Sequence, residues 1–323
     1  MLGVGSPLLD GLAQVDDEFL RKEVAGEKGG MVMIQSSERN RLLDLLSKSI
    51  SWAPGGSAGN TVFALARMGI PAAMLGKVGI DKEGELYTNT FKQLGGSTLE
   101  FVTTSRHSTG ICLSLVTPDA ERTMRSDLGA AATLTAEDIQ KTDFSRYSIV
   151  LIEGYMLFSA AFDAVIERAA AAGCKIAFDL ASFEVVNIFR ERLQDLLPKV
   201  SILFANADEA RALCGDLPPE TMLEQLASTC HTVALKLGKD GAIVRHGNET
   251  VRVSARLVEN PVDTTAAGDL WAAGFLYGMA KRCPVQQAAE YGAVLSGEVV
   301  QVMGSVIPEQ GWQRINQSLN FIQ

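Results

Sequence analysis

The sequence of 323 residues has no long apolar run, no closely paired cysteines and no excess of positive charge. Each absence excludes a class of protein. No stretch of about 18 consecutive apolar residues, the length expected of a membrane-spanning helix, is present. The first residues also lack the basic and apolar parts of a secretory signal. We therefore expect a cytoplasmic protein that has no membrane partner.

The five cysteines are widely spaced, and the nearest two, Cys214 and Cys230, lie 16 residues apart. None of the three histidines stands at metal-ligand spacing from a cysteine. This pattern disfavours a structural zinc site and a disulfide framework, and it favours buried, reduced thiols.

Basic residues are scarce, because 29 lysines and arginines face 38 aspartates and glutamates, giving a net charge of −9. Nucleic acids and anionic membranes are bound by clustered basic side chains, so this balance disfavours both as partners. Hydrophobic residues make up 47% of the chain, which is enough to bury a sizeable core. We expect a folded monomer or homodimer whose partner is a small molecule.

The second half of the sequence alternates short apolar runs with helical stretches. Strands are predicted at residues 148–152, 175–180, 201–205 and 232–237. Helices are predicted at residues 159–172, 185–197 and 208–214. Continuous apolar strands separated by helices are typical of parallel strands that are buried on both faces. The sequence thus predicts an α/β fold with a doubly wound, mostly parallel sheet.

The first half contains a hairpin that does not fit this alternation. Residues 110–117 and 122–126 are strand-like, with a turn between them and polar residues along their length. Such a hairpin is either an edge of the main sheet or part of a small lid. We favour the lid because of the motifs described below.

The segment 263–269, Asp-Thr-Thr-Ala-Ala-Gly-Asp, precedes a predicted helix at residues 270–280. Three small residues, Ala266, Ala267 and Gly268, leave backbone N–H groups uncovered where a helix begins, which predicts an anion hole. Asp269 falls in the first helical turn, where it can accept a proton from a hydroxyl that attacks phosphorus. A plain capped helix would explain Asp269 but not the small residues before it.

Polar or glycine-rich segments follow two of the predicted strands, where ligands bind in open α/β sheets. Asn206 to Glu209 follows the strand at 201–205, and Gly238 to Gly241 follows the strand at 232–237. A capping box would also explain the first segment, and an ordinary hairpin turn would explain the second. Both interpretations stay open.

Two further segments could bind hydroxyl groups. Gly55 and Gly56 let the backbone approach a ligand closely, and Ser57 and Asn60 can hydrogen-bond hydroxyls. Asp10 is a lone carboxylate after a glycine-containing first strand, suited to binding two neighbouring sugar hydroxyls. Taken alone, each segment is better explained by a simple turn.

Two common nucleotide-binding motifs are absent. No Gly-x-x-x-x-Gly-Lys-Ser/Thr segment occurs, and the Gly3-x-Gly5 pair lacks the third glycine of a dinucleotide fingerprint. These absences disfavour a P-loop enzyme and a dinucleotide-dependent reductase.

In combination, these segments resemble the ribokinase-like (PfkB) sugar and nucleoside kinases. The matching motifs follow the family's order from Gly3 to about Gly304; they are GGSAGN, GKVGIDKEG, NADE, LGKDG and DTTAAGD followed by Ala273-Gly274-Phe275. The segments 5–10 and 15–20 look most like the adenosine-kinase branch.

The resemblance implies one ribokinase-like domain over residues 1–323, with a small β lid formed by residues 10–35 and 105–130. It implies ATP as phosphoryl donor with Mg²⁺. The catalytic residues it implies are a base, an anion hole and a lid arginine that reaches toward the transferred phosphate: Asp269, Ala266, Ala267, Gly268 and Arg122. The residues it implies for ATP and magnesium are Asn206, Glu209, Lys236, Gly238 and Gly241. Lys236 stands where a threonine is common in the family.

The residues expected to contact substrate are Asp10, Gly55, Gly56, Ser57, Asn60 and Tyr155. We expect the substrate to be a purine nucleoside, adenosine first, phosphorylated on its primary hydroxyl. Tyr155, with Met156 and Phe158, could stack on a base, although all three could equally belong to the core. The alternatives are a kinase of free ribose or fructose and a catalytically silent ligand-binding homologue. Asp263 and Thr265 resemble parts of a monovalent-cation site, which predicts activation by K⁺.

Overall fold

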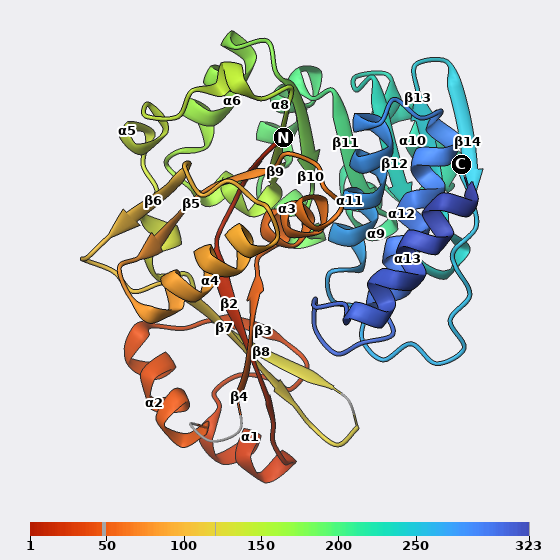
Figure 1. The fold of residues 1–323 in the computed structure, drawn as a ribbon. Helices are drawn as coiled ribbons and strands as arrows, with labels where there is room; N and C mark the ends of the chain where they lie inside the picture. Colours follow the sequence, from red (N-terminus) through yellow and green to blue (C-terminus); the bar gives the residue numbers. More distant parts are fainter. Residues whose placement is uncertain (47–49, 120, 323) are drawn as a thin grey trace.

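The computed structural model describes residues 1–46, 50–119 and 121–322. Its larger part is built on a nine-stranded sheet, in the order β14-β13-β12-β11-β10-β9-β1-β5-β6 (Figure 1). The strands are β1 (Leu2–Val4), β5 (Ala73–Gly79), β6 (Phe101–Thr104), β9 (Ile149–Glu153), β10 (Lys175–Asp179), β11 (Ile202–Asn206), β12 (Thr232–Lys236), β13 (Ala242–His246) and β14 (Glu249–Val253). Pairs from β6 to β12 are parallel, and β12, β13 and β14 pair antiparallel.

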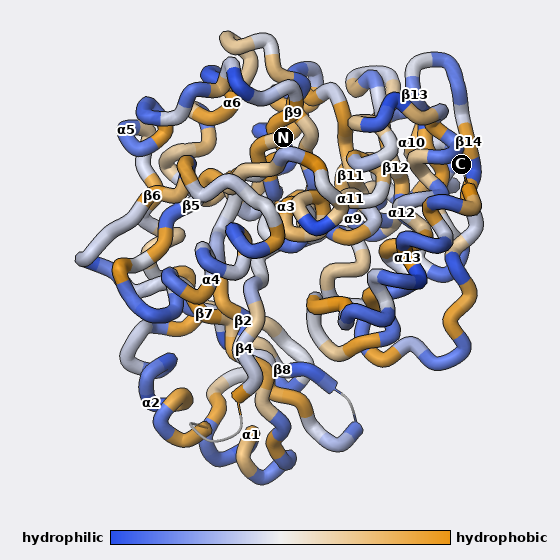
Figure 2. The backbone as a smooth tube through the Cα atoms, viewed as in Figure 1, coloured by the Kyte–Doolittle hydropathy of each residue, from blue (hydrophilic) through white to orange (hydrophobic). Residues whose placement is uncertain are grey.

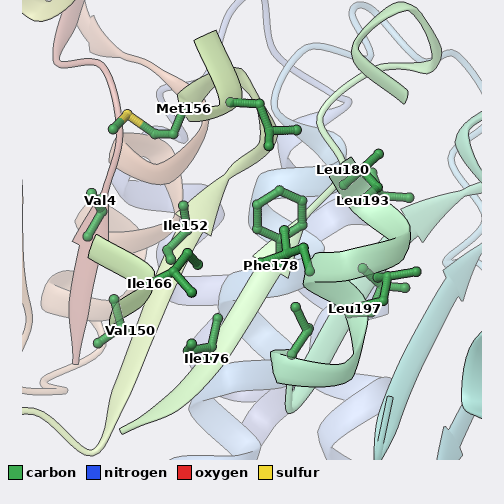
Figure 3. Packing of buried hydrophobic residues seen from close by; sticks show 14 of the residues in the cluster. Val4, Val150, Ile152, Met156, Ile166, Ile176, Phe178, Leu180, Leu193 and Leu197 are labelled. Atoms are coloured by element: carbon green, nitrogen blue, oxygen red, sulfur yellow. The ribbon is translucent and has the colours of Figure 1, made fainter. Parts of the chain in front are cut away.

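Helices cover both faces of this sheet because successive residues of its buried strands point to opposite sides. On one face, Val150 and Ile152 pack with helices between residues 136 and 227, from which Figure 3 shows Ile166 and Leu193. On the other face, Ile149 and Leu151 pack with helices within residues 57–93 and 267–322. The doubly wound, mostly parallel α/β fold predicted from the sequence is therefore confirmed.

The helices have the following bounds: α1 (Asp17–Glu23), α2 (Ser36–Leu46), α3 (Ser57–Arg67), α4 (Lys82–Gln93), α5 (Ala136–Ile139), α6 (Phe162–Ala171), α7 (Phe183–Ile188), α8 (Arg190–Leu196), α9 (Ala207–Cys214), α10 (Pro219–Ala227), α11 (Ala267–Ala280), α12 (Val285–Val299) and α13 (Glu309–Ile322). The one helix predicted at 185–197 is two, because the backbone leaves helical geometry at Phe189, with φ −110° and ψ 22°. The Phe189 ring packs edge-on against Phe158, with centroids 4.7 Å apart.

A separate five-stranded sheet, which we call the small sheet, extends from the larger part (Figure 1). Its order is β3-β8-β7-β2-β4, formed by β2 (Leu8–Gln14), β3 (Met31–Met33), β4 (Ile50–Gly55), β7 (Gly110–Val116) and β8 (Arg122–Asp127). The hairpin β7–β8 thus belongs to this sheet and not to an edge of the large one. One face packs on α1 and α2 through Leu9, Leu20 and Leu42.

Both segments expected to form a lid contribute strands to the small sheet. Strand β4 of this sheet and helix α2, which packs on it, come from residues outside those two segments. Ala120, in the second of those segments, lies outside the described residues.

Across the molecule, apolar stretches concentrate in the central strands, and polar ones in the outer turns (Figure 2). Within the described part of the chain, no helix has both the length and the apolar character needed to cross a bilayer.

Candidate active site

The carboxyl ends of β10, β11 and β12 meet the N-terminal turn of α11 around a cavity of about 410 Å³. We call this space the central cavity. Its lining includes eleven of the residues proposed from the sequence: Ser57, Tyr155, Asn206, Glu209, Lys236, Gly238, Gly241, Ala266, Ala267, Gly268 and Asp269. Segments up to 212 residues apart thus converge where ligands bind in α/β sheets.

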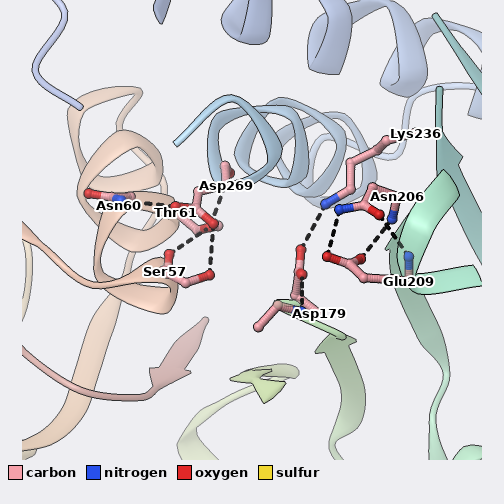
Figure 4. Close-up of polar contacts among 9 residues, drawn as sticks. Ser57, Asn60, Thr61, Asp179, Asn206, Glu209, Lys236 and Asp269 are labelled. Carbon is pink, nitrogen blue, oxygen red and sulfur yellow. Dashed lines mark hydrogen bonds and ion pairs between the residues drawn. The ribbon is translucent and has the colours of Figure 1, made fainter. Parts of the chain in front are cut away.

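The carboxylate of Asp269 is held by side chains from the start of α3. The Ser57 hydroxyl donates to one carboxylate oxygen at 2.7 Å, and the Asn60 amide donates to the other at 2.9 Å (Figure 4). The Thr61 hydroxyl donates to the backbone carbonyl of Asp269 at 3.0 Å, which ties the two helices together. The carboxylate therefore has a fixed orientation at the cavity wall.

Burial is the main cause that raises the pKa of Asp269 to about 6, and the charge of Asp179 adds to it. The hydrogen bonds from Asn60 and Ser57 and the charge of Lys236 oppose this rise. A carboxylate with a pKa near 6 is ionised at neutral pH, yet it is more basic than an exposed aspartate. These are the properties of an effective proton acceptor.

The turn before Asp269 has an unusual backbone. Ala266, the residue before α11, has φ 59° and ψ 5°, which is the left-handed region that side chains rarely occupy. The small residues Ala266, Ala267 and Gly268 line the cavity at the start of α11, and the Ala267 N–H donates to the Thr264 carbonyl at 3.2 Å. The anion hole at this turn stays a prediction from the sequence.

Asn206 and Glu209 form a capping box at the start of α9 and also line the cavity. The Asn206 side chain accepts the Glu209 N–H at 2.9 Å, and the Glu209 carboxylate accepts the Asn206 N–H at 2.7 Å. The capping box that the sequence left open is thus confirmed, and the role of the two residues in binding ATP and magnesium stays a prediction. Burial and the nearby Asp179 raise the pKa of Glu209 to about 7, against the effect of Lys236.

Lys236 and Asp179 end β12 and β10, and their side chains form an ion pair of 3.0 Å between Nζ and Oδ2 (Figure 4). The other Asp179 oxygen accepts the N–H of Ala181 at 3.0 Å. Gly238 and Gly241, with φ values of 59° and 88°, form the turn between the antiparallel strands β12 and β13. The hairpin turn is therefore confirmed; both glycines also line the cavity, and their contact with ATP stays a prediction.

A second cavity of about 340 Å³ adjoins the first and shares Gly238, Gly241, Ala267, Trp271 and Ser296 with it. Its remaining walls include Leu257, Val258, Pro261 and Val300. We call it the apolar cavity. No sequence pattern indicates this cavity. The segment 255–261, which forms part of its wall, contains no motif and forms no helix or strand.

Asp10 belongs to β2 of the small sheet and lies near enough to Asp269 for the charge of that carboxylate to act on it. Burial raises its pKa to about 7; Arg122 opposes this rise, and the charges of Asp269 and Asp263 add to it. Gly55 has no room for a side chain, because a Cβ atom there would overlap the Asp10 carboxylate. Gly56 has φ 85°, and a Cβ atom there would meet the carbonyl oxygen of Ser6. Both glycines are therefore required by this geometry.

Arg122 does not point into the central cavity. Its Nη1 atom lies 3.0 Å from both carboxylate oxygens of Asp263, and Nη2 donates to the Ser114 hydroxyl at 2.8 Å. Asp263 also accepts the Thr265 N–H and hydroxyl and the Gly304 N–H. Both Asp263 oxygens therefore already accept hydrogen bonds, and the potassium site at Asp263 and Thr265 stays a prediction.

The aromatic patch expected at 155–158 is not formed as one surface. Tyr155 lines the central cavity, but Met156 is 3% exposed and belongs to the core under the large sheet. Phe158 is exposed and packs on Phe189. The short helical turn at 154–158 directs the three side chains in different directions. Closeness in the sequence was therefore not enough to predict a shared surface.

Sequence reasoning missed Glu153 and Asp179, the last residues of β9 and β10. Glu153 is 2% exposed and accepts the N–H groups of Ser6 and Ala58, each at 2.8 Å. It thereby joins the link between β1 and β2 to the first turn of α3. Glu153 follows the strand predicted at 148–152, and Asp179 is the last residue but one of the strand predicted at 175–180, so the rule applied to the later strands would have found them.

Comparisons with known proteins agree with this geometry. Residues 30–311 match the family described as pfkB family carbohydrate kinase. The crystal structure of adenosine kinase from Sinorhizobium meliloti is 32% identical and covers 98% of each chain, with a TM-score of 0.86. Adenosine kinase 2 of Arabidopsis thaliana is 25% identical over 96% of both chains. An uncharacterized sugar kinase of Archaeoglobus fulgidus is 25% identical over 75% of this chain and 96% of its own. The chain therefore belongs to the pfkB family of carbohydrate kinases, as its motifs indicated.

Proposed function

We propose that this kinase transfers the terminal phosphoryl group of ATP to the primary hydroxyl of a ribose-containing acceptor, most specifically a purine nucleoside such as adenosine. One observation carries the proposal. The buried Asp269 carboxylate, held by Ser57 and Asn60, stands in the same helical turn as the N–H groups of the anion hole. A proton acceptor and an anion-binding turn are thus fixed within one turn of each other.

In the proposed reaction, the acceptor hydroxyl lies against Asp269, and Asp10 binds the neighbouring ring hydroxyls. Asp269 takes the hydroxyl proton as the new oxygen–phosphorus bond forms and the bond to the ADP oxygen breaks. The Gly268 N–H group at the start of α11 holds the negative charge that develops on the phosphoryl oxygens, since the Ala267 N–H already donates to the Thr264 carbonyl at 3.2 Å. The chain's part in the reaction is positioning and charge stabilisation.

Magnesium fits this site through water and phosphate rather than through a cage of protein ligands. Among the described residues, no three His, Cys, Asp or Glu side chains are grouped to hold a metal. Mg²⁺ bound to nucleotides keeps several waters and uses one or two carboxylates, and Glu209 and Asp179 line the cavity with such oxygens. The ion would neutralise charge on the phosphates, and Asn206 would orient Glu209 toward its waters.

The apolar cavity is our candidate for the base of ATP. It adjoins the central cavity at Ala267, so a nucleotide that binds there extends its phosphates toward the N-terminus of α11. Its walls are mostly apolar, with the Trp271 ring among them, which suits a flat base.

The small sheet supports a nucleoside over a bare sugar as acceptor. Strand pairing puts Asp10, Cys112, Ser126 and Met33 in one row across the sheet, so they share a face. Met31, two residues from Met33, shares it too, and these methionines are 48% and 52% exposed. Thioether side chains beside a hydroxyl-binding carboxylate suit an apolar ring attached to the sugar. The similarity to adenosine kinases points the same way.

This face and the Arg122–Asp263 ion pair also support the lid role that we propose for the small sheet. Arg122 belongs to β8, and Asp263 precedes α11, so the pair joins the two parts of the molecule across the site. The inner face would then exclude water from the acceptor.

A kinase of free ribose or fructose is the second candidate, favoured by the similarity to the Archaeoglobus sugar kinase. ADP release measured with ATP, Mg²⁺ and a panel of nucleosides and free sugars separates the two. We expect adenosine to give the highest kcat/KM. Turnover of free sugars alone would overturn the nucleoside proposal, and no turnover with any acceptor would favour a silent binding protein.

A further inference from the structure

The side chain of Lys236 ends beside the N-terminal turn of α11. A Cβ atom added at Gly268 would lie only 3.0 Å from the Lys236 ammonium nitrogen, so the glycine leaves that nitrogen open to the turn. The Lys236 side chain is 12% exposed and lines the central cavity. A positive charge is thus fixed at the helix end that already presents N–H groups.

The ammonium group has hydrogen-bonding capacity that the protein leaves unused. It carries three N–H donors. Asp179 accepts one of them, and within residues 1–46, 50–119 and 121–322 no second acceptor contacts it. Burial lowers the pKa of Lys236, but Asp179 and Glu209 together raise it above its ordinary value. The group therefore stays charged and can donate to a ligand in the cavity.

Lys236 is also the place in the cavity where an anionic group meets a positive side chain. Three carboxylates line the cavity, those of Asp179, Glu209 and Asp269, and Lys236 is the one basic side chain among the residues that line it. Since Asp179 holds the ammonium, Lys236 forms no ion pair with Asp269, whose carboxylate stays available to accept a proton.

We propose that Lys236 is a catalytic residue whose ammonium group binds a non-bridging oxygen of the transferred phosphoryl group. This inference rests on the proposed function and deepens it. As the acceptor oxygen bonds to phosphorus and the ADP oxygen leaves, the ammonium stabilises the charge on the equatorial oxygens. The proton still goes to Asp269, and Lys236 stays protonated throughout.

The test compares Lys236→Met with Lys77→Met. Lys77 is a matched control, because it too is a mostly buried lysine, paired with Asp138 at 2.8 Å, and it does not line the cavity. Calorimetry measures the binding of a non-hydrolysable ATP analogue and of ADP. A kinase assay with the best acceptor measures kcat. For K236M we expect about tenfold weaker binding of the analogue, ADP binding within about twofold, and kcat lower by about 10²–10³-fold. For K77M we expect both affinities and kcat within about twofold of the parent.

An unchanged ratio of analogue to ADP affinity in K236M, or a kcat within about threefold of the parent, would overturn the proposal. If K236M does not fold because Asp179 is left unpaired, the double variant D179N/K236M removes both buried charges, and the same two measurements decide. If the parent protein phosphorylates no acceptor, the proposed function fails, and the affinity ratio alone still decides the role of Lys236.

Discussion

The loop before Ala266 and the helical turn after it each carry one aspartate, and the two have opposite electrostatic surroundings. Asp263 accepts hydrogen bonds from Gly304, Thr265 and Arg122, which outweigh burial and hold its pKa below the ordinary value. Asp269 is buried with two side-chain donors and has a raised pKa of about 6. The number of donors around each carboxylate thus explains the difference: Asp263 stays ionised in its ion pair, whereas Asp269 can take up a proton.

Asp269→Asn tests most directly whether the aspartate with the raised pKa is the proton acceptor. The amide keeps the shape of the side chain but cannot accept the hydroxyl proton, so we expect kcat to fall by about 10²–10⁴-fold. Acceptor Kd should change much less, since the amide oxygen can still accept a hydrogen bond. Turnover within a few-fold of the parent would eliminate Asp269 as the base. Asp263→Asn serves as the comparison variant and should lose far less than D269N.

Arg122→Ala tests the other aspartate through stability. Removing the guanidinium leaves the Asp263 side chain, 6% exposed, without its charge partner, and we expect the free energy of unfolding to fall by about 3 kcal/mol. Urea denaturation measures the change. The double variant R122L/D263N removes both charges and should be more stable than R122A. A double variant no more stable than R122A would contradict this account of the pair.

The same pair decides the response to potassium. In the parent protein the guanidinium already occupies Asp263, so we expect equal rates in KCl and NaCl at matched ionic strength. In R122A the freed carboxylate can accept a cation, and a difference between the salts should emerge. A preference of the parent for K⁺ would restore the cation site expected from the sequence.

The two aspartates should also respond oppositely to pH. Because the folded pKa of Asp269 is raised from 3.8 to about 6, its contribution to stability is full below pH 3.8 and is lost as the pH rises through 6. The lowered pKa of Asp263 gives stability that is present above pH 3.8 and is lost as the pH falls through its folded value. Activity, in contrast, needs Asp269 ionised, so kcat/KM should fall below about pH 6.

Comparison of the parent with D269N measures this effect together with its influence on Asp10, Glu153 and Glu209, because burial and, among further causes, the charge of Asp269 raise the pKa of each to about 7. From pH 4 to 7 the parent should lose stability relative to the variant. A constant difference across this range would show that the pKa of Asp269 is not raised.

Local pattern was enough to predict much of the site, and long-range geometry was not. Small residues before a helix and polar residues after strands singled out residues 266–268, Asn206 and Glu209, which the structure brings to one cavity. The Lys236–Asp179 ion pair depends on the order of β10, β11 and β12, which no local pattern gives. The Arg122–Asp263 pair joins residues 141 positions apart, and the sequence showed only their charges.

The helix break at Phe189 and the separate directions of Tyr155, Met156 and Phe158 were missed for a related reason. Each depends on which neighbours a side chain packs against, and packing overrides the helical periodicity of the segment.

The small sheet also bears on the order in which the molecule can be assembled during synthesis. Its central pair joins β2 to β7 in parallel, with Leu8 opposite Gly110. A nascent chain therefore carries β2 for about a hundred residues before its parallel neighbour leaves the ribosome, and β8 follows later still. Through that interval β2 has β4 as its available strand partner, and its other edge is open to mispairing. The small sheet, which we propose as the lid, is completed only after residue 127, yet well before the turn that carries Asp269 has been made.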